Sequence, residues 1–241
     1  MLLVVEINKL QLELNQCTDL VRVGEQHERG HLIPARAIAK TKTLLSLGAN
    51  DNWAFDRAFQ QLNPDCKVVG VDYQLSLSSI VSGAFSSGAK SLQSALLGQL
   101  KQSKQHVKAL LNRVLLYTFY SSGNRLLRRR VSDHTNEVDI SLETLIAVYG
   151  TIEDNATMLN ISMSCDEYHM VDDIIRLESM LSVVTIELSP VPDCMSQVNQ
   201  FIERMSESFE VVHISGGEID EHSQAPLELT FMNRRLASPA K

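Results

Sequence analysis

Short apolar runs alternate with helical patterns from about residue 43 onward, and this alternation restricts the fold more than any other feature of the chain. A buried strand needs only such a short run, and a helix between two runs lets successive strands lie parallel in one sheet. Seven runs match this pattern: 43–48, 67–72, 114–119, 157–163, 183–188, 209–214 and 227–232. The sequence therefore predicts an α/β fold with a mostly parallel seven-stranded sheet and helices on both faces.

Helical spacing fills the segments between these runs. Phe55, Phe59 and Leu62 recur at i, i+4 and i+7 after the first run, which indicates a helix. The polar, small-residue stretch 73–113 is also expected to be helical, with an interruption near 82–88 where serine and glycine cluster. Apolar faces at helical spacing precede the fifth and sixth runs as well.

The last two runs have no helical pattern between them, so we expect an antiparallel pair at one edge of the sheet. Upstream, the basic segment 124–139 is predicted to be a connector. SLETLIAVY, which follows at 141–149, has the opening of a short capped helix.

Length and charge set further bounds. A chain of 241 residues can bury one good core, so 1–241 is expected to be one domain with residues 1–42 as an N-terminal helical or loop addition. The net charge of −7 disfavours broad nucleic-acid binding, which depends on neutralising phosphates with Lys and Arg. The opening MLLVV is too short for a signal segment or a membrane span.

The four cysteines are widely scattered and form no C-x-x-C pair; they are Cys17, Cys66, Cys165 and Cys194. Such spacing is typical of reduced thiols that are buried as small apolar residues. Because disulfides are rare in reducing compartments, this pattern predicts a cytoplasmic protein.

The turn after the first predicted strand has features of a nucleoside site. The strand runs into Gly48 and then a helix, which brings backbone N–H groups to the carboxyl edge of the sheet. Asp72 ends the next strand, 24 residues later, about where an acid accepts hydrogen bonds from a ribose diol. The turn lacks G-x-G-x-x-G, so a dinucleotide pyrophosphate is disfavoured. S-adenosylmethionine, which has no diphosphate, would tolerate Asn50 and Asp51, although an ordinary capped strand–turn–helix is the alternative.

Two histidines four residues apart lie in RVGEQHERGHLIP, residues 22–34. His27 and His31 would suit zinc only on a continuous helix with a third ligand. Gly30 lies between them, Pro34 follows closely, and there is no H-E-x-x-H pattern. We therefore expect no metal site, and predict a loop that folds over the cofactor site.

The basic run RLLRRR contains Arg125 and Arg128 to Arg130. Guanidinium groups match phosphates and carboxylates, so this run could clamp such a group. A run of like charges is more often a solvated surface, and both interpretations stay open.

RVGEQHERGHLIP, LLSLGANDNWAFDRAF and VVGVD together resemble the FkbM-type branch of S-adenosylmethionine-dependent methyltransferases. In that branch R-x-G…D-G-G-Y-x-x-P precedes S-x-G-x-x-x-D-x-x-F-E and a strand that ends in Asp. Later segments resemble later blocks of the family in the same order: NEVDISLETL, LNISMSCDEYHMVDDI, FEVVHISGG and LELTF. The resemblance spans about residues 20 to 233. It implies a Rossmann-like class I methyltransferase fold with an antiparallel last strand, and O-methyl transfer, often to a sugar hydroxyl.

The cofactor half of the family pattern is better kept than the acceptor half. Ser162 and Ser164 stand where the family prefers acids, which leaves too few hard ligands for a dedicated Mg²⁺ or Ca²⁺ site. His31 takes the position of a family tyrosine, and the family's H-x-N-N appears here as His213 followed by Ile, Ser and Gly. We therefore predict metal-independent transfer.

The site residues follow from this comparison and from the strand ends. S-adenosylmethionine is expected to contact Gly48, Ala49, Asn50, Asp51, Asp72 and Tyr73. The candidates for the base that accepts the hydroxyl proton are Asp166, Glu167 and His213, although Asp166 could equally cap a helix.

The leading prediction is an S-adenosylmethionine-dependent O-methyltransferase for a small-molecule or glycan hydroxyl. One alternative is a degenerate module that binds the cofactor without transferring the methyl group, which the two serines motivate. Another is an RNA-directed methyltransferase that uses the arginine run. Net acidity and an aromatic content of 5% weaken this second alternative.

Overall fold

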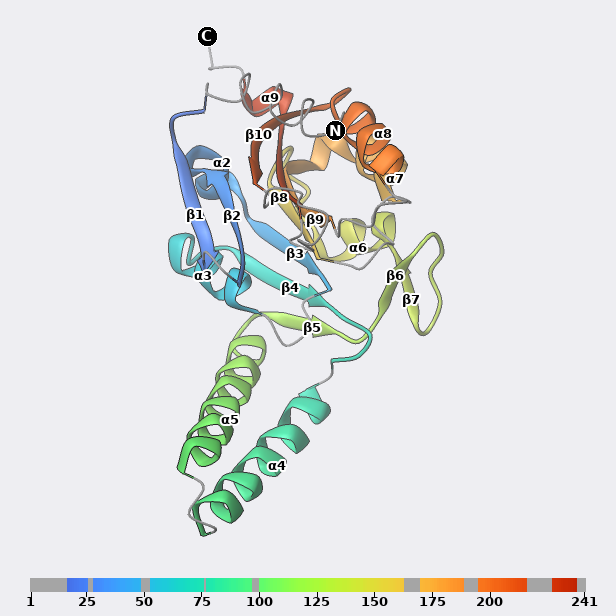
Figure 1. The fold of residues 1–241 in the computed structure, drawn as a ribbon. Coiled ribbons are helices and arrows are strands. Elements are labelled where there is room, and N and C mark those ends of the chain that lie inside the picture. The colour runs from blue at the N-terminus through green and yellow to red at the C-terminus, as the bar shows by residue number, and fades with distance from the viewer. Residues whose placement is uncertain are drawn as a thin grey trace.

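A seven-stranded sheet forms the centre of the protein (Figure 1). The computed structural model describes residues 17–25, 28–48, 53–75, 77–96, 100–162, 170–188, 195–215 and 227–237. In spatial order the strands are β10 (Phe209–Ser215), β11 (Leu227–Asn233), β9 (Leu181–Leu188), β8 (Thr157–Ile161), β3 (Thr43–Leu47), β4 (Lys67–Val71) and β5 (Arg125–Leu127).

β11 runs antiparallel to both of its neighbours, whereas the other neighbouring pairs in this sheet are parallel. From β3 the chain first adds β4 and β5 on one side and then β8 and β9 on the other. The strand order therefore reverses between β3 and β8, where open α/β sheets place their ligands. The topology confirms the predicted fold class, including the antiparallel pair at the β10 edge.

The central strands are buried because helices cover both faces of the sheet. All five residues of β3 and of β8 are buried, as expected for parallel strands between two helical layers. One face packs against α6 (Leu142–Tyr149), α7 (Val171–Arg176), the short helix η2 (Glu178–Met180) and α8 (Met195–Met205). The other face packs against α2 (Ala35–Lys40) and α3 (Ala54–Leu62).

The predicted cap of α6 is present. The hydroxyl of Ser141 accepts a hydrogen bond from the backbone N–H of Thr144, 3.2 Å away. This contact satisfies one of the backbone donors that a helix leaves open in its first turn. A short helix, α9 (Arg234–Ala237), follows β11.

One predicted strand is wrong. Residues 114–119 belong to α5 (Leu100–Ser121), and the third parallel strand is β5, inside the expected basic connector. Leu116 and Tyr120 are buried while Leu115 and Tyr117 are exposed, which is helical spacing. A short apolar run is compatible with either element until its neighbours are known.

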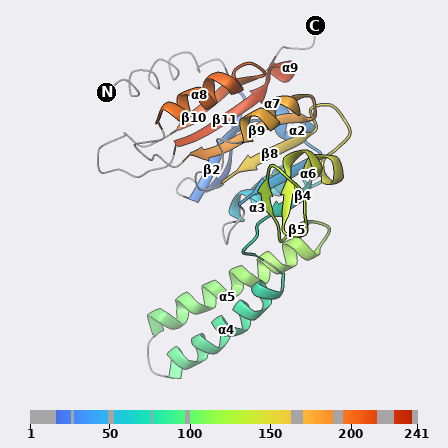
Figure 2. The same cartoon turned by 90° about the vertical axis from the view of Figure 1, so that its right-hand side faces the viewer.

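The predicted break near residues 82–88 is also wrong, because α4 (Leu77–Leu96) continues through it. The small residues there face α5: a side chain at Gly83 would collide with Arg113, and one at Gly88 would touch Leu110. The serine and glycine cluster therefore brings two helices together. α4 and α5 form an antiparallel pair that projects from the β5 side of the sheet (Figures 1 and 2).

The segment predicted as a loop is a β-hairpin. β1 (Leu20–Glu25) pairs antiparallel with β2 (Glu28–Pro34). Val23, His31 and Ile33 are buried, since alternate residues of a strand point to the same side. The hairpin packs on α3 and beside β10 and β11.

The basic connector contains a second small element. β6 (Arg130–Ser132) and β7 (Asp139–Ser141) form a two-stranded parallel pair of their own. Among the described helices, none combines the length and the apolar character needed to cross a membrane.

Candidate active site at the carboxyl edge of the sheet

The turn after β3 and the end of β4 lie side by side, as the sequence predicts. Gly48 has a φ of +73°, a left-handed conformation that glycine adopts without steric cost. Its N–H donates to the carbonyl of Val71, the last residue of β4, at 2.9 Å. The turn and the neighbouring strand end are thus fixed to each other at the point where the strand order reverses.

Asp72 is held rigidly at this edge. Its side chain is buried, and its Oδ1 accepts hydrogen bonds from the backbone N–H of Gln74 at 2.7 Å and of Leu75 at 3.1 Å. Tyr73, next to it, is exposed, and its carbonyl accepts a hydrogen bond from Arg128. The carboxylate of Asp72 is therefore oriented by its own turn, beside Gly48.

Several predicted site residues lie outside the described part of the chain. They are Ala49, Asn50, Asp51, Asp166 and Glu167. Of the predicted base candidates, the structure describes His213, on β10.

Two acids and two serines lie along the carboxyl edge of the sheet, on the β8 side of the point where the strand order reverses. These four residues are called the acid–serine row from here on. Glu187 on β9 and Glu228 on β11 are cross-strand partners. The hydroxyl of Ser162 donates to Glu187 at 3.1 Å, and the hydroxyl of Ser215 donates to Glu228 at 2.8 Å. Two carboxylates therefore lie beside each other, each bound by a serine.

Burial raises the pKa of Glu228, and the neighbouring carboxylate of Glu187 adds to the rise. The hydroxyl of Ser215 and the positive charge of Arg22 oppose it. A carboxyl group with a raised pKa holds its proton more readily, which suits it to exchange a proton with a bound hydroxyl.

Sequence reasoning missed Glu187 and Glu228. Ser162 in the sequence predicts the loss of an acid, whereas in the structure its hydroxyl binds an acid that the adjacent strand supplies. One signal was available: Glu187 follows an apolar run, just as Asp72 does. Glu228 is different, because its place at this edge depends on β11 running antiparallel.

A second polar row lies one step below this edge, on the face covered by α3. Thr185 donates to Asn160 at 2.9 Å, and Asn160 donates to Ser46 at 3.2 Å. Ser46 in turn hydrogen-bonds to Asp56 of α3. These buried contacts tie β9, β8, β3 and α3 together.

Tyr120 completes this row from α5, donating to Asp56 Oδ2 at 2.7 Å. A side chain at Gly70 would lie 2.5 Å from the Tyr120 hydroxyl, so only glycine admits the ring there. Burial raises the pKa of Asp56 to about 6, against the lowering effect of its bonds from Tyr120 and Ser46.

Two histidines meet at the β10 end of the same row. A β-bulge between Val211 and His213 puts His213 opposite Thr230; a bulge of this kind redirects the side chains that follow it. His31 approaches from the hairpin, 2% exposed, with its ring edge-on to Phe55 at 5.7 Å. In the described chain, His31 Nδ1, His213 Nε2 and Thr230 Oγ1 are buried without a hydrogen-bond partner.

Both histidines are neutral at neutral pH. Burial first, and then the neighbouring His213 and Arg22, lower the pKa of His31 to about 3. The pKa of His213 is also lowered, first by burial and then by Arg22. A neutral imidazole has a nitrogen able to accept a proton, so His213 keeps the chemistry of a base candidate.

Replacing His31 with phenylalanine is expected to stabilise the protein at acidic pH. Between its folded pKa of about 3 and its ordinary value of 6.5, the unfolded chain binds a proton that the folded chain excludes. The free energy of unfolding of the wild type therefore falls as the pH drops through this window, by up to about 1.4 kcal/mol per pH unit from this group. Phenylalanine removes that loss.

Asp56 acts in the opposite direction, because its folded pKa of about 6 lies above its ordinary value of 3.8. Its contribution to the free energy of unfolding is present at low pH and is lost as the pH rises through this range. This loss is the same in the wild type and in His31→Phe. Chemical denaturation of wild type and His31→Phe at neutral pH and at about pH 4.5 isolates His31. His134→Phe is the control, since Asp133 raises the pKa of the exposed His134 and no acidic gain is expected. An equal stability difference at both pH values would contradict the prediction.

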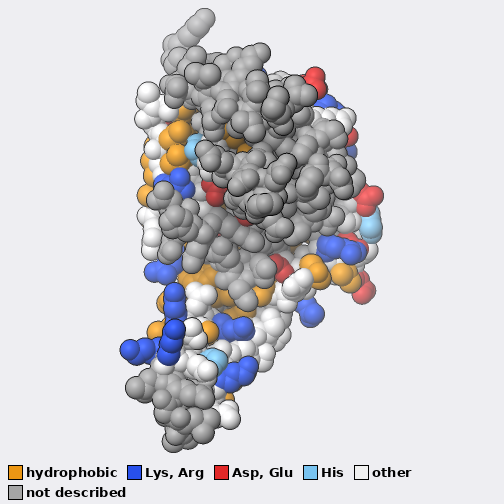
Figure 3. All heavy atoms as spheres, viewed as in Figure 1, with side chains coloured by type: hydrophobic (Ala, Val, Ile, Leu, Met, Phe, Trp, Pro, Cys, Tyr) orange, Lys and Arg blue, Asp and Glu red, His pale blue; other side chains and the backbone are white. Residues whose placement is uncertain are grey.

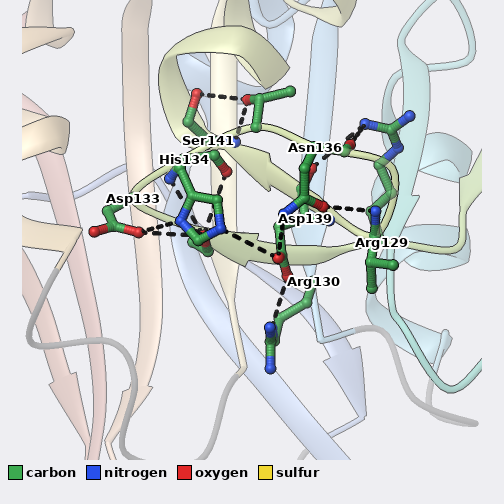
Figure 4. Close-up of polar contacts among 10 residues, drawn as sticks. Arg129, Arg130, Asp133, His134, Asn136, Asp139 and Ser141 are labelled. Carbon is green, nitrogen blue, oxygen red and sulfur yellow. Dashed lines mark hydrogen bonds and ion pairs between the residues drawn. The ribbon is translucent and has the colours of Figure 1, made fainter.

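The arginine run does not form one anion clamp, because its members point to different partners (Figure 4). Arg130 Nε lies 2.9 Å from Asp139 Oδ1, and Arg129 donates to the carbonyl of Asn136 at 2.9 Å. Arg125 lies over the ring of Tyr149, 5.8 Å from its centre. The contacts of Arg129 and Arg130 fasten the loop between β6 and β7, whereas that of Arg125 joins β5 to α6.

Metal-ligating side chains are not grouped in the part of the chain that the structure describes: no three His, Cys, Asp or Glu residues there are placed to hold an ion.

Comparison with known proteins gives structural matches alone. No family model matches the chain, and no curated protein matches it. A precorrin-6y C5,15-methyltransferase from Geobacter metallireducens GS-15 has 11% identity and a TM-score of 0.42, covering 83% of this chain and 86% of that chain. The N-methyltransferase NodS from Bradyrhizobium japonicum WM9 has 11% identity and a TM-score of 0.42, and the match covers 83% of this chain and 92% of that chain. An rRNA methylase from Streptococcus thermophilus has 12% identity and a TM-score of 0.41, and the match covers 83% of this chain and 90% of that chain.

Proposed function

We propose that this protein is an S-adenosylmethionine-dependent methyltransferase that acts on a hydroxyl group. The observation that carries the proposal is the pairing of Gly48 and Asp72 at the reversal of the strand order. Glycine in a left-handed turn lets a ligand approach the backbone, and a buried carboxylate one strand away can accept hydrogen bonds from a ribose diol. The residues present therefore fit a nucleoside.

S-adenosylmethionine would supply a methyl group already activated by its sulfonium, so the protein has mainly to align an acceptor oxygen with it. Asp72 would orient the ribose, with its own carboxylate oriented by the N–H groups of Gln74 and Leu75. The turn at Gly48 would face the rest of the nucleoside.

The acceptor is proposed to be a sugar or glycan hydroxyl, bound along the acid–serine row. Carboxylates and neutral imidazoles accept hydrogen bonds from hydroxyl groups. Glu187, Glu228 and His213 offer such acceptors on neighbouring strands. Asp166 and Glu167 stay candidates for the base alongside them. This acceptor class, like the FkbM-type relationship, is supported by the sequence resemblance.

Three further predictions carry over to the proposal. The N-terminal hairpin is proposed to cover part of the cofactor site, and the protein is proposed to act in the cytoplasm without a metal ion. The engagement of Arg129 and Arg130 within the β6–β7 loop makes an RNA acceptor the weaker alternative.

Asp72→Ala tests the cofactor assignment. We expect the variant to bind S-adenosylhomocysteine about 1.5–3 kcal/mol more weakly, the range for hydrogen bonds to a charged group. Isothermal titration calorimetry measures the change. Because alanine also removes the turn contacts to Gln74 and Leu75, Asp72→Asn, which keeps an acceptor oxygen for the turn, is measured alongside.

Asp65→Ala is the control, since Asp65 is an exposed acid on the loop before β4. An unchanged dissociation constant in a folded Asp72 variant would remove Asp72 from the site. A wild-type protein that binds neither S-adenosylmethionine nor S-adenosylhomocysteine would refute the proposed function. Binding without transfer to any member of a broad panel of hydroxyl compounds would favour the binding module.

A further inference from the structure

The helical pair α4–α5, called the arm from here on, differs in charge from the rest of the protein. Residues 77–121 contain five Lys and Arg and no Asp or Glu. The other 17 of the 22 cations and all 29 acids lie elsewhere, so this segment carries +5 and the remainder −12. In Figure 3 blue side chains lie along the arm, while the red ones lie on the body above it.

Small residues make the seam between the two helices. Ser91 of α4 and Ser103 of α5 hydrogen-bond to each other at 3.3 Å through their hydroxyls. Gly83 lies against Arg113, and Gly88 lies against Leu110. Small residues of this kind let two helices approach closely.

Large apolar side chains point away from this seam. Phe85 is 78% exposed, Leu92 is 70% exposed and Leu111 is 56% exposed. Eight of the thirteen large apolar residues that are exposed in the described chain lie on the arm. A helical pair that stays in water would bury such residues between its helices, so the exposed set indicates a partner that covers it.

Six of these eight exposed apolar residues lie on one side of the arm. In α4, Val81, Phe85 and Leu92 each follow a more buried residue by one position: Ile80, Ala84 and Ser91. In α5, Val107, Leu111 and Val114 likewise follow His106, Leu110 and Arg113. One position is about 100° around a helix. Because the helices are antiparallel, the same rotation turns both stripes to the same side, which gives one continuous apolar face.

Lysines border this face. Lys101, Lys104 and Lys108 are exposed: Lys104 follows the seam residue Ser103 by one position, in line with the α5 stripe, and Lys101 and Lys108 lie farther round α5 from α4. The ion pairs among described residues include none of these lysines. Long lysine side chains can therefore reach past the apolar stripe to an anionic surface beside it.

We propose that the arm docks its apolar face on a membrane surface that contains anionic lipid. An apolar stripe bordered by lysines is the pattern of helices that lie in the interface between lipid headgroups and acyl chains. Phe85 is the single aromatic side chain of the stripe, and its valines and leucines offer no stacking surface for successive bases, so the stripe suits lipid better than single-stranded RNA. Pairing of two arms through these faces would bring their lysine rows together, which like charges oppose.

Vesicle co-sedimentation of the full chain tests the proposal. We expect binding to vesicles of equimolar phosphatidylcholine and phosphatidylglycerol, and much weaker binding to phosphatidylcholine alone. Replacing Lys101, Lys104 and Lys108 with glutamine should weaken binding to the anionic vesicles about a hundredfold, since each lysine near such a surface contributes about one factor of five. Phe85→Ser with Leu111→Ser should weaken it about tenfold or more.

Matched controls distinguish an effect of the arm from a general effect of removing positive charge or apolar surface. The first control changes three exposed lysines on the body to glutamine and so removes the same charge as the arm variant; they are Lys40, Lys42 and Lys67. Ile152→Ser removes an apolar side chain that is 95% exposed outside the arm. Both controls should bind as the wild type does.

The fluorescence of the single tryptophan, Trp53, reports whether the variants stay folded, since its ring packs on Phe119 of α5 at 5.3 Å. Absence of binding to anionic vesicles would overturn the proposal, as would arm variants that bind as well as the wild type. An arm-dependent dimer by light scattering, or arm-dependent binding of a single-stranded RNA in place of vesicles, would also overturn it.

Discussion

His213→Ala is expected to lower the turnover number for methyl transfer about 10²–10⁴-fold, the usual contribution of a positioned general base. The dissociation constant for S-adenosylhomocysteine should stay nearly unchanged, because Gly48 and Asp72 lie on the other side of the strand-order reversal. The physical reason is the β-bulge after Val211, which turns a neutral imidazole toward the covered face of β10. Loss in turnover without loss of cofactor affinity marks an interaction made during the reaction.

Single-turnover kinetics with a responsive hydroxyl compound measures this effect. His134→Ala, on the exposed β6–β7 loop, is the control and should react as the wild type does. Asp166→Asn, Glu167→Gln and Glu228→Gln are measured in the same assay, because the sequence or the acid–serine row makes each a rival base. A normal rate in His213→Ala with a large loss in one of these would move the base to that residue. Normal rates in all four would contradict the placement of the acceptor site at this edge.

Phe59→Ala is expected to lower the free energy of unfolding by about 3–5 kcal/mol, the range for removing a large buried aromatic side chain. Phe59 is fully buried on α3 and stacks on Phe55, 6.3 Å between ring centres. Its loss leaves a cavity between α3 and the sheet that the surrounding residues cannot close completely.

Leu62→Ala is the matched control on the same helix, because Leu62 is 49% exposed. Surface changes of this kind usually stay within about 0.5 kcal/mol. Equilibrium urea denaturation compares the two variants. If Phe59→Ala cost no more than Leu62→Ala, α3 would not be anchored on the sheet as described.

The central strands could be predicted because each is a local signal. β3, β4, β8 and β9 are buried on both faces, so their apolar residues are continuous in the sequence. Residues 114–119 carry the same local signal, yet they are helical. They differ from a strand because Leu116 and Tyr120, at i and i+4, are buried against α3 and β4. Both of these elements are far away in the sequence.

The placement of Gly48 and Asp72 side by side at this edge could be predicted for the same reason. Gly48 and Asp72 each sit at the end of their own strand, so their position is set by the nearest apolar run. The pairing of Glu187 with Glu228 depends on the register between β9 and β11. The meeting of His31 with His213 depends on a bulge and on a hairpin that packs across the sheet. Neither contact is encoded by the spacing of residues along the chain.

The position of β11 constrains the order in which this sheet can be completed during synthesis. β10 is at the edge, and its hydrogen-bonded neighbour in the sheet is β11, which comes later in the chain. When β10 leaves the ribosome, the place next to β9 must still be empty, since β11 has yet to enter it. The edge of β9 is thus exposed until residue 233 has been made, and His213 and Glu228 reach the site together, in the last step of assembly.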